Sequence, residues 1–146
     1  EAELGEVGGK NGVHDPSART SPQDAAAFVS DTGVDLLAVA VGSSHAMTTR
    51  DAHLDEDLIR AIRAAVDVPL VLHGSSGVSD AGMTAAIAAG MTKINVSTHL
   101  NKVFTGTVRS ALAEDPALVD SRKWMKPARS AVEDETCRLL RLYAGA

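Results

Sequence analysis

The sequence predicts an α/β fold in which parallel β-strands alternate with α-helices. Two near-continuous apolar runs, Leu36–Gly42 and Val68–Gly74, are typical of strands that are covered on both faces of a sheet. Helix start and stop signals lie between the apolar runs, so strand and helix follow each other repeatedly. This order predicts a series of right-handed βαβ units.

Four strands are expected. Besides the two apolar runs, Lys93–Thr98 has the composition of a strand, and Ala2–Val7 is a weaker candidate because apolar and acidic residues alternate in it. The sequence therefore predicts a sheet of at least four parallel strands, with one helix after each strand.

Five helices are expected. The first begins at Ser21, which resembles an N-cap followed by proline at the first helical position, and it ends at Gly33. The third opens at Ser79 and stops at Gly90, and the second is indicated by apolar residues at helical spacing (Leu54, Leu58, Ile59, Ile62 and Val66). The fourth follows Thr98 and ends before Pro116, and the last runs from about Pro127 to Tyr143.

This succession fits either an open, doubly wound sheet or part of an eight-stranded barrel. No GxGxxG motif lies at a strand–helix turn, so the dinucleotide-binding form of the open sheet has no support.

Composition narrows the class of protein. The 146 residues have the size of one domain, and a net charge of −5 gives no electrostatic footprint for nucleic acid. No apolar run is long enough to span a bilayer. The single cysteine, Cys137, excludes an internal disulfide and fits a reducing cytoplasm. The chain begins with Glu1 rather than methionine, so we expect a piece of a longer protein.

Histidines end two of the predicted strands. His45 and His73 lie at equivalent depth on strands that follow each other in sequence, and consecutive strands are usually neighbours about 4.8 Å apart. Two imidazoles can then converge on one ion, and neutral imidazole nitrogens suit Zn²⁺. The alternative is that each histidine caps its strand. The sequence shows no clear third ligand.

Small polar residues follow two strands. Gly74–Gly77 and Asn95–Thr98 place backbone N–H groups and hydroxyls ahead of a helix, which is an arrangement that binds phosphate. The alternative is a pair of tight turns in which glycine only allows a positive φ. Two such loops on successive strands resemble the common phosphate site of barrel enzymes.

Several other residues are weaker candidates. Lys93 could be a Schiff-base lysine, as in some barrel aldolases, or a pairing lysine. The acidic residues of the first strand could be metal neighbours or a polar barrel interior (Glu1, Glu3 and Glu6). The remaining histidines are expected to be solvated or to cap other groups (His14, His53 and His99).

Together these stretches resemble the class II, zinc-dependent fructose-bisphosphate aldolases and their tagatose-bisphosphate relatives. The resemblance is carried by Glu1–Gly9, Phe28–His45, Pro69–Val78 and Lys93–Leu100, and Asp120–Arg129 is similar to the tail motif of that family. The resemblance implies a TIM (β/α)8 barrel. It also implies that residues 1–146 are the C-terminal portion of one barrel domain, about four β/α units plus a C-terminal helix, without its N-terminal half.

The resemblance also implies roles for individual residues. His45 and His73 match two of the three zinc ligands, and a monovalent cation is a further candidate cofactor. The phosphate of dihydroxyacetone phosphate is expected at Gly74, Ser75 and Ser76, and the second substrate-contacting stretch is Asn95, Val96, Ser97 and Thr98. Asn95 is expected near the enediolate and is the one catalytic candidate of this chain. The third zinc histidine and the proton-transferring aspartate of the family lie earlier in its barrel.

Two positions depart from the family pattern. Ala46 stands where the family usually has a glycine whose N–H binds the substrate phosphate, and alanine can keep that contact if its φ is negative. Lys10 and Asn11 stand where many members carry an acidic pair, so no acid–base carboxylate is expected there.

The implied reaction is the reversible cleavage of fructose 1,6-bisphosphate, a step of glycolysis, into dihydroxyacetone phosphate and glyceraldehyde 3-phosphate. Zinc then acts as a Lewis acid on the ketone oxygen, and Lys93 is structural. The full-length protein is expected to be a cytoplasmic homo-oligomer, dimer or tetramer, that takes a phosphorylated sugar and binds neither nucleic acid nor membrane.

Three alternatives remain at this point. The substrate could be tagatose bisphosphate, which differs from the fructose compound in configuration at one carbon. The chain could be a catalytically silent fragment, since half a barrel lacks its acid–base group and exposes two sheet edges. A zinc hydrolase of the amidohydrolase type would need a metal-binding aspartate after the last strand, where Asn95–Thr98 offers none.

Overall fold

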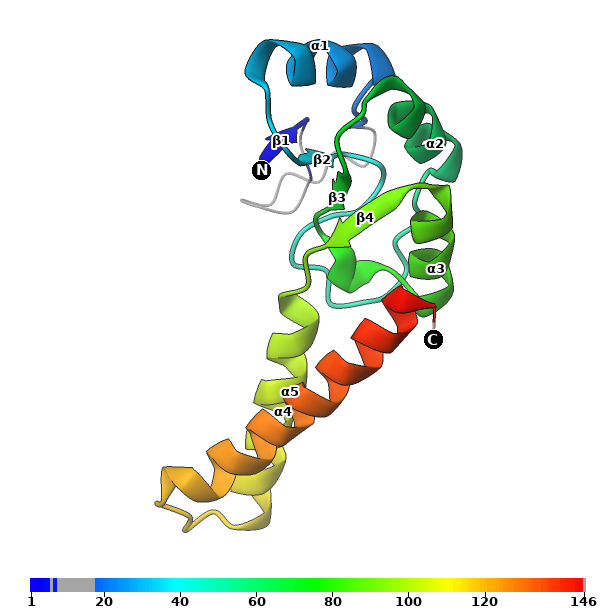
Figure 1. The fold of residues 1–146 in the computed structure, drawn as a ribbon. Helices are drawn as coiled ribbons and strands as arrows, with labels where there is room; N and C mark the ends of the chain where they lie inside the picture. The colour runs from blue at the N-terminus through cyan, green and yellow to red at the C-terminus, as the bar shows by residue number, and fades with distance from the viewer. Residues whose placement is uncertain (6, 8–17, 146) are drawn as a thin grey trace. The chain divides into compact units, whose positions relative to one another are not determined.

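The structure, a computed structural model, describes residues 1–5, 7 and 18–145 and has the expected α/β organisation (Figure 1). The chain divides into two compact units, Glu1–Val96 and Ser97–Ala146. The first unit contains every described strand, and the second contains two helices.

The first unit is built on a four-stranded parallel sheet in the order β1-β2-β3-β4. Each strand therefore pairs with the strand that follows it in sequence, as expected for successive βαβ units. The strands are β1 (Ala2–Leu4), β2 (Leu37–Val39), β3 (Leu70–Leu72) and β4 (Met91–Ile94). All residues of β2 and β3 are buried, which explains why their sequences are continuously apolar.

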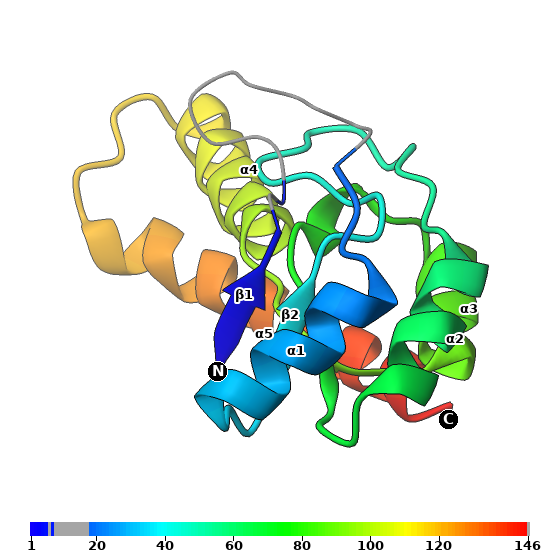
Figure 2. The same cartoon turned by 90° about the horizontal axis from the view of Figure 1, so that it is seen from above.

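Three helices connect these strands: α1 (Pro22–Thr32), α2 (Glu56–Ala65) and α3 (Asp80–Ala89). Each begins after a residue whose side chain accepts a hydrogen bond from a backbone N–H of the first turn (Ser21, Asp55 and Ser79). Such caps satisfy donors that the helix itself cannot use. The helices lie in sequence order beside the sheet, α1 next to α2 and α2 next to α3 (Figure 2).

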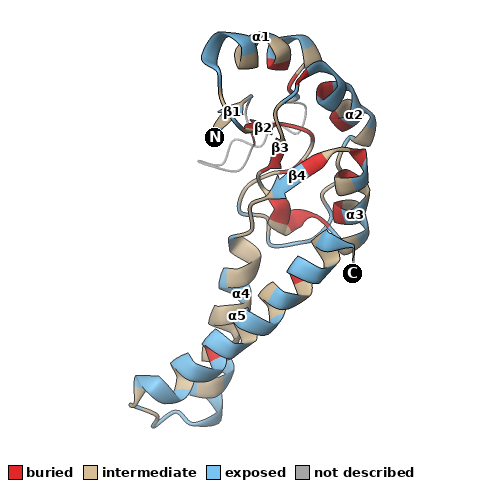
Figure 3. Cartoon of the chain, viewed as in Figure 1, coloured by how far each residue is buried: buried red, intermediate tan, exposed pale blue. Residues whose placement is uncertain are grey.

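The core of this unit lies between the sheet and the helices, where Figure 3 shows the buried residues concentrated. Most of its largest fully buried side chains come from β2, β3 and α2 (Leu37, Val39, Leu70, Val71, Leu72, Ile59 and Ile62), and two come from the segments that follow the strands (Val41 and Val78). Burying one such side chain contributes about 1.5–3 kcal/mol. This packing fixes the position of the strand ends that carry the polar residues.

The second unit is a helical hairpin of α4 (Thr98–Glu114) and α5 (Ser121–Ala144), which pack against each other. Only Ala128 and Leu139 of α5 are buried, and α4 buries none of its residues. In the described part of the chain, neither of these helices nor any other is apolar enough over a sufficient length to cross a bilayer.

Several element boundaries differ from the sequence-based expectation. The last strand is Met91–Ile94 rather than Lys93–Thr98, because the chain enters the sheet directly after Gly90 ends α3. Thr98 is instead the first residue of α4.

The last helix begins at Ser121 rather than near Pro127. Asp120 caps it by accepting a hydrogen bond from the backbone N–H of Arg122, and Pro127 lies inside the helix. Proline removes one backbone donor, a cost that this 24-residue helix tolerates. The other three strands are also shorter than expected. β1 ends earlier, and β2 and β3 are shorter at both ends.

Candidate active site

The pairing register places several polar residues on one face of the sheet. Glu3 pairs with Ala38, Ala38 with Val71, and Val71 with Lys93, so these four residues form one row across the strands. Side chains two positions apart on a strand point to the same side. Glu1, His73 and Asn95 lie two positions from residues of this row and are therefore expected on the same face.

The contacts agree with this arrangement. The carboxylate of Glu1 forms an ion pair with Lys93 and accepts a hydrogen bond of 3.3 Å from Nδ2 of Asn95. In a flat sheet, β1 and β4 would be roughly 14 Å apart, since three inter-strand spacings separate them. Glu1 precedes β1 and Lys93 lies in β4, so direct contact between their side chains is favoured by a sheet that curves toward this face, as the wall of a barrel does.

His45 and His73 come together as the sequence predicts. Their ring centroids are 5.9 Å apart and the ring planes are inclined by 49°. Ligand atoms of Glu3, His45 and His73 all lie within 4.8 Å of one another. The two histidines are half-buried and Glu3 is exposed, so the three groups meet at a surface that solvent reaches.

This donor set fits a zinc ion. Two histidines and one glutamate form a known catalytic zinc set, which leaves a fourth position open. With bonds of about 2.0–2.2 Å, two ligands of a tetrahedral zinc lie roughly 3.4 Å apart. The donor atoms of Glu3, His45 and His73, all within 4.8 Å of one another, lie in the range from which small side-chain rotations reach that spacing. The sequence indicates Glu3 as a metal neighbour or as part of a polar barrel interior, not as a ligand. The alternation of acidic and apolar residues in the first strand is the sequence pattern that points to it.

His73 is held from three sides. Its backbone carbonyl accepts a hydrogen bond of 2.6 Å from Oγ of Ser43. Its Nε2 lies 3.0 Å from Oε1 of Glu1, and its Nδ1 contacts the carboxylate of Glu3. The imidazole orientation is therefore set by two carboxylates, that of Glu1 just before β1 and that of Glu3 within it.

Glu1 is an anion in this arrangement. The hydrogen bond from Lys93, and next that from His73, lower the pKa of the Glu1 carboxyl from 4.5 to about 2, although partial burial opposes the shift. Lys93 thus faces a carboxylate rather than an open space, which supports its interpretation as a pairing lysine.

Gly74 and Ser75 form a tight junction after β3. Gly74 has a φ of 67°, and a Cβ there would lie 2.7 Å from the carbonyl carbon of Ser44, so only glycine fits. Ser75 is buried at 4% exposure, and its hydroxyl donates a hydrogen bond of 2.6 Å to the carbonyl of Asn95. That hydroxyl therefore joins the loops after β3 and β4, while Ser76 beside it is half-buried.

The second predicted phosphate stretch crosses the boundary between the two units. Asn95 and Val96 follow β4 in the first unit, and the backbone N–H of Asn95 donates to the carbonyl of Leu72 at 3.1 Å. Ser97 and Thr98 begin the second unit, where Ser97 precedes α4 without capping it through its side chain.

Ala46 corrects one expectation. Its φ is 59°, not negative, and it is the only described residue other than glycine with a positive φ. The left-handed region disfavours residues with a Cβ by roughly 1–2 kcal/mol. Alanine thus adopts here the backbone conformation that a glycine would take without strain.

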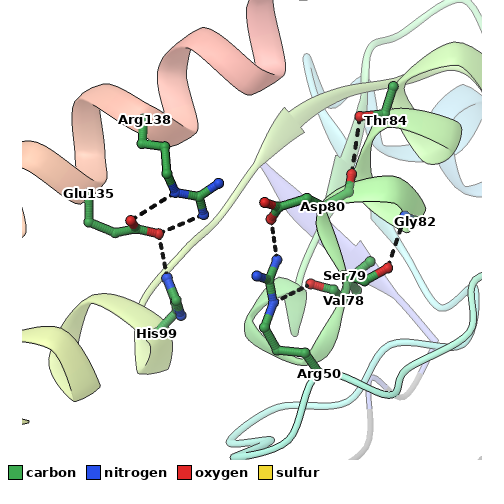
Figure 4. Close-up of polar contacts among 9 residues, drawn as sticks. All are labelled: Arg50, Val78, Ser79, Asp80, Gly82, Thr84, His99, Glu135 and Arg138. Carbon is green, nitrogen blue, oxygen red and sulfur yellow. Dashed lines mark hydrogen bonds and ion pairs between the residues drawn. The ribbon is translucent and has the colours of Figure 1, made fainter.

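The other candidates lie elsewhere. His53 is exposed, and His99 pairs with Glu135 at 2.6 Å within the second unit (Figure 4). Glu6, Lys10, Asn11 and His14 lie outside the described residues.

One buried residue near the site is not expected from sequence. Thr20 is 3% exposed; its hydroxyl donates to the carbonyl of Leu4 at 2.6 Å and accepts from the N–H of Ala40 at 2.9 Å. It therefore joins the end of β1 to the segment after β2 and helps to fix Glu3 in register. A lone threonine before a helix gives no sequence signal of this role.

Comparison with known proteins identifies the family. A family model described as fructose-bisphosphate aldolase class-II matches residues 1–146. The chain belongs to the class II fructose-bisphosphate aldolase family. This agrees with the geometry above, in which the class II motifs supply the histidines and the glycine loop.

Solved structures agree with the class II fold. The YdjI aldolase of Escherichia coli K12 is 35% identical with a TM-score of 0.69, over 85% of this chain and 44% of that chain. A Coccidioides immitis protein assigned as a fructose-1,6-bisphosphate aldolase is 26% identical with a TM-score of 0.72, over 97% of this chain and 50% of that chain.

A third match supports the fold alone. The fructose-bisphosphate aldolase of Campylobacter jejuni is 23% identical with a TM-score of 0.61, over 94% of this chain and 48% of that chain. The chain thus spans about half the length of these aldolase structures, and its four β/α units correspond to about half of a TIM barrel.

Proposed function

We propose that the protein containing this chain catalyses reversible aldol cleavage of fructose 1,6-bisphosphate to dihydroxyacetone phosphate and glyceraldehyde 3-phosphate. Tagatose 1,6-bisphosphate is the alternative substrate. The observation that carries the proposal is the convergence of Glu3, His45 and His73, whose ligand atoms lie within 4.8 Å of one another beside the Gly74 turn.

The metal is proposed to be Zn²⁺, held by His45 and His73 with Glu3 as a further donor. When bound, it would supply Lewis-acid polarisation of the substrate ketone. Glu1 orients His73 through their 3.0 Å contact, and Lys93 and Asn95 in turn hold Glu1.

The substrate phosphate is proposed to bind backbone N–H groups of Gly74, Ser75 and Ser76, with Ala46 beside them. The glycine turn leaves room for backbone to approach the anion. The family resemblance assigns Asn95, Val96, Ser97 and Thr98 to the rest of the substrate, with Asn95 nearest the reacting carbons. A monovalent cation near the phosphate is a further candidate.

Residues 1–146 would form the C-terminal portion of one barrel domain, and the proton-transferring aspartate would come from outside this chain. The rival amidohydrolase interpretation still lacks its aspartate, since Asn95, Val96 and Ser97 follow β4. We propose a cytoplasmic homo-oligomer, in line with the proposed glycolytic role.

The test uses the full-length protein. Cleavage of fructose and tagatose 1,6-bisphosphates is followed by coupled reduction of the triose phosphates, with and without a zinc chelator. We expect chelator-sensitive turnover that Zn²⁺ restores and that His73→Ala abolishes, whereas His53→Ala, an exposed histidine, retains it. Cleavage that persists after complete zinc removal would refute the metal assignment.

A further inference from the structure

Two loops lie side by side at the C-terminal end of the sheet. We name residues 43–53, which follow β2 and carry His45, the His45 loop, and residues 74–79, which follow β3, the Gly74 loop. Close to the histidines they are joined by the hydrogen bond from Ser43 to the His73 carbonyl and by the tight fit of Gly74 against Ser44.

The loops also meet at their far ends. The backbone N–H of Ala52 donates to the carbonyl of Gly77 at 2.9 Å, and Ala52 forms an isolated parallel bridge with Val78. Gly77 packs so closely on Met47 that a Cβ would collide with that side chain. The His45 loop is therefore supported along its whole length by the Gly74 loop.

Arg50 makes the side-chain connection at this far end (Figure 4). Its Nε donates to the carbonyl of Val78 at 3.0 Å, and its terminal nitrogen pairs with Asp80 at 2.5 Å. Asp80 is the first residue of α3, where a carboxylate is favoured by the helix dipole. One guanidinium thus holds both a carbonyl near the end of the Gly74 loop and the first residue of the helix that follows it.

We propose that Arg50 is a positioning residue that fixes the His45 loop against the Gly74 loop and so sets the spacing between His45 and the phosphate-binding turn. This inference rests on the proposed function of that site. An exposed ion pair contributes little to global stability. The side chains of Arg50 and Asp80 are 38% and 41% exposed, so we expect their ion pair to act by holding the two loops in place rather than by stabilising the fold. This position is important because both loops carry residues that must contact the same ligand.

The chain offers a matched control. Arg60 on α2 also contacts two acceptors, here the carboxylates of Glu56 and Asp57, but all three residues lie within one helix and join no loops. Arg60→Ala therefore removes a comparable guanidinium and comparable ion pairs without touching the connection. Arg50→Lys keeps the charge, but a single ammonium replaces the planar fork that reaches both acceptors.

The first measurement is amide hydrogen exchange of the full-length protein without metal. We expect the Ala52 amide, bonded to Gly77, to exchange at least tenfold faster in Arg50→Ala, and by an intermediate factor in Arg50→Lys. Arg60→Ala should leave that rate unchanged, and the urea midpoints of Arg50→Ala and Arg60→Ala should be similar. An unchanged Ala52 rate in Arg50→Ala overturns the proposal. If that variant fails to fold, an unchanged rate in Arg50→Lys overturns it instead.

The second measurement is Zn²⁺ affinity, by competition with a chromophoric chelator. We expect Arg50→Ala to weaken binding roughly fivefold to tenfold, Arg50→Lys to restore part of it, and Arg60→Ala to stay within twofold. Equal affinity in Arg50→Ala and wild type overturns the positioning role. If the wild-type protein binds no zinc, the proposed function fails, and the exchange of Ala52 still decides whether Arg50 joins the loops.

Discussion

Nε2 of His73 lies 3.0 Å from Oε1 of Glu1, while the opposite ring nitrogen faces Glu3. Each ring nitrogen of His73 thus faces a carboxylate, so the two contacts by themselves do not select one tautomer. If Nδ1 and Glu3 both bind the proposed metal, Glu1 is the carboxylate that remains to accept a hydrogen bond from Nε2–H. Glu1 is therefore the residue that would hold His73 in the metal-binding tautomer.

Glu1→Gln in the full-length protein should weaken Zn²⁺ binding 10–100-fold, the usual cost of losing the partner of a metal-binding histidine. The amide keeps the size of the side chain but not its charge. Competition with a chelator measures the effect, and Glu133→Gln, an exposed position on α5, is the control. Zinc affinity that does not differ between the two variants would contradict the role of Glu1.

Lys93 should form no covalent intermediate, because its ammonium is paired with Glu1 and the proposed mechanism needs no imine. Borohydride treatment of the full-length protein with dihydroxyacetone phosphate should leave Lys93 unmodified in peptide mass spectra. A reduced adduct on Lys93 would replace the metal mechanism by Schiff-base chemistry.

Ala46→Gly should stabilise the protein by about 1 kcal/mol, because glycine adopts the φ of 59° without the strain of a Cβ. The same substitution at Ala27, exposed on α1, should cost about 1 kcal/mol through helix propensity. Urea unfolding of both variants measures whether each substitution raises or lowers the free energy of unfolding. Destabilisation by Ala46→Gly would mean that the loop does not hold this residue in the left-handed region.

Glu135 should give the second unit a stability that depends on acid pH. The hydrogen bonds from Arg138, and then from His99, lower the pKa of the Glu135 carboxyl to about 2 (Figure 4). Because this lies below the unfolded value of 4.5, the charged group stabilises the fold fully above about pH 5, and the contribution is lost as pH falls from 4.5 toward 2.

Partial exposure of Arg138, at 42%, reduces this contribution to roughly 1–2 kcal/mol. The difference in unfolding free energy between wild type and Glu135→Gln should therefore shrink over that pH range. A difference that stays constant from pH 6 to pH 2.5 would show that the carboxylate contributes nothing through its charge.

Residues 1–146 alone should not cleave fructose 1,6-bisphosphate above background. Loss of general acid–base catalysis typically costs 10²–10⁴-fold in rate, and the proposed proton-transferring aspartate is not among these residues. A coupled assay with added Zn²⁺ measures this, with the full-length protein as the positive control. Robust turnover by residues 1–146 would place the acid–base group in this chain, with Glu3 or Glu6 as the first residues to replace.

Much of the first unit could be predicted because its signals are local. Pro22 after Ser21, and glycine at positions 33 and 90, mark helix ends through backbone geometry that no distant contact changes. The meeting of His45 and His73 was predictable only in part: β2 and β3 are neighbours as expected and His73 directly follows β3, but His45 lies in the loop beyond β2 and not at the strand end.

The remaining features depend on contacts that no local pattern reports. Thr20 and Arg50 act through backbone carbonyls of other segments, and any carbonyl looks the same in a sequence. The early start of α5 is not predicted because Pro127 resembles a first helical position, whereas the cap at Asp120 determines the boundary. The positive φ of Ala46 follows from the surrounding loop and not from the residue type.

The ion pair between Glu1 and Lys93 has a consequence for the two edges of the sheet. It joins the residue before β1 to β4, and both partners belong to residues 1–96, so the two edge strands have a direct side-chain link within the first unit. Because the side chain of Lys93 is 46% exposed, this link adds little to the free energy of unfolding by itself. Exchanging the charges of Glu1 and Lys93 should keep the link, whereas neutralising either residue should remove it.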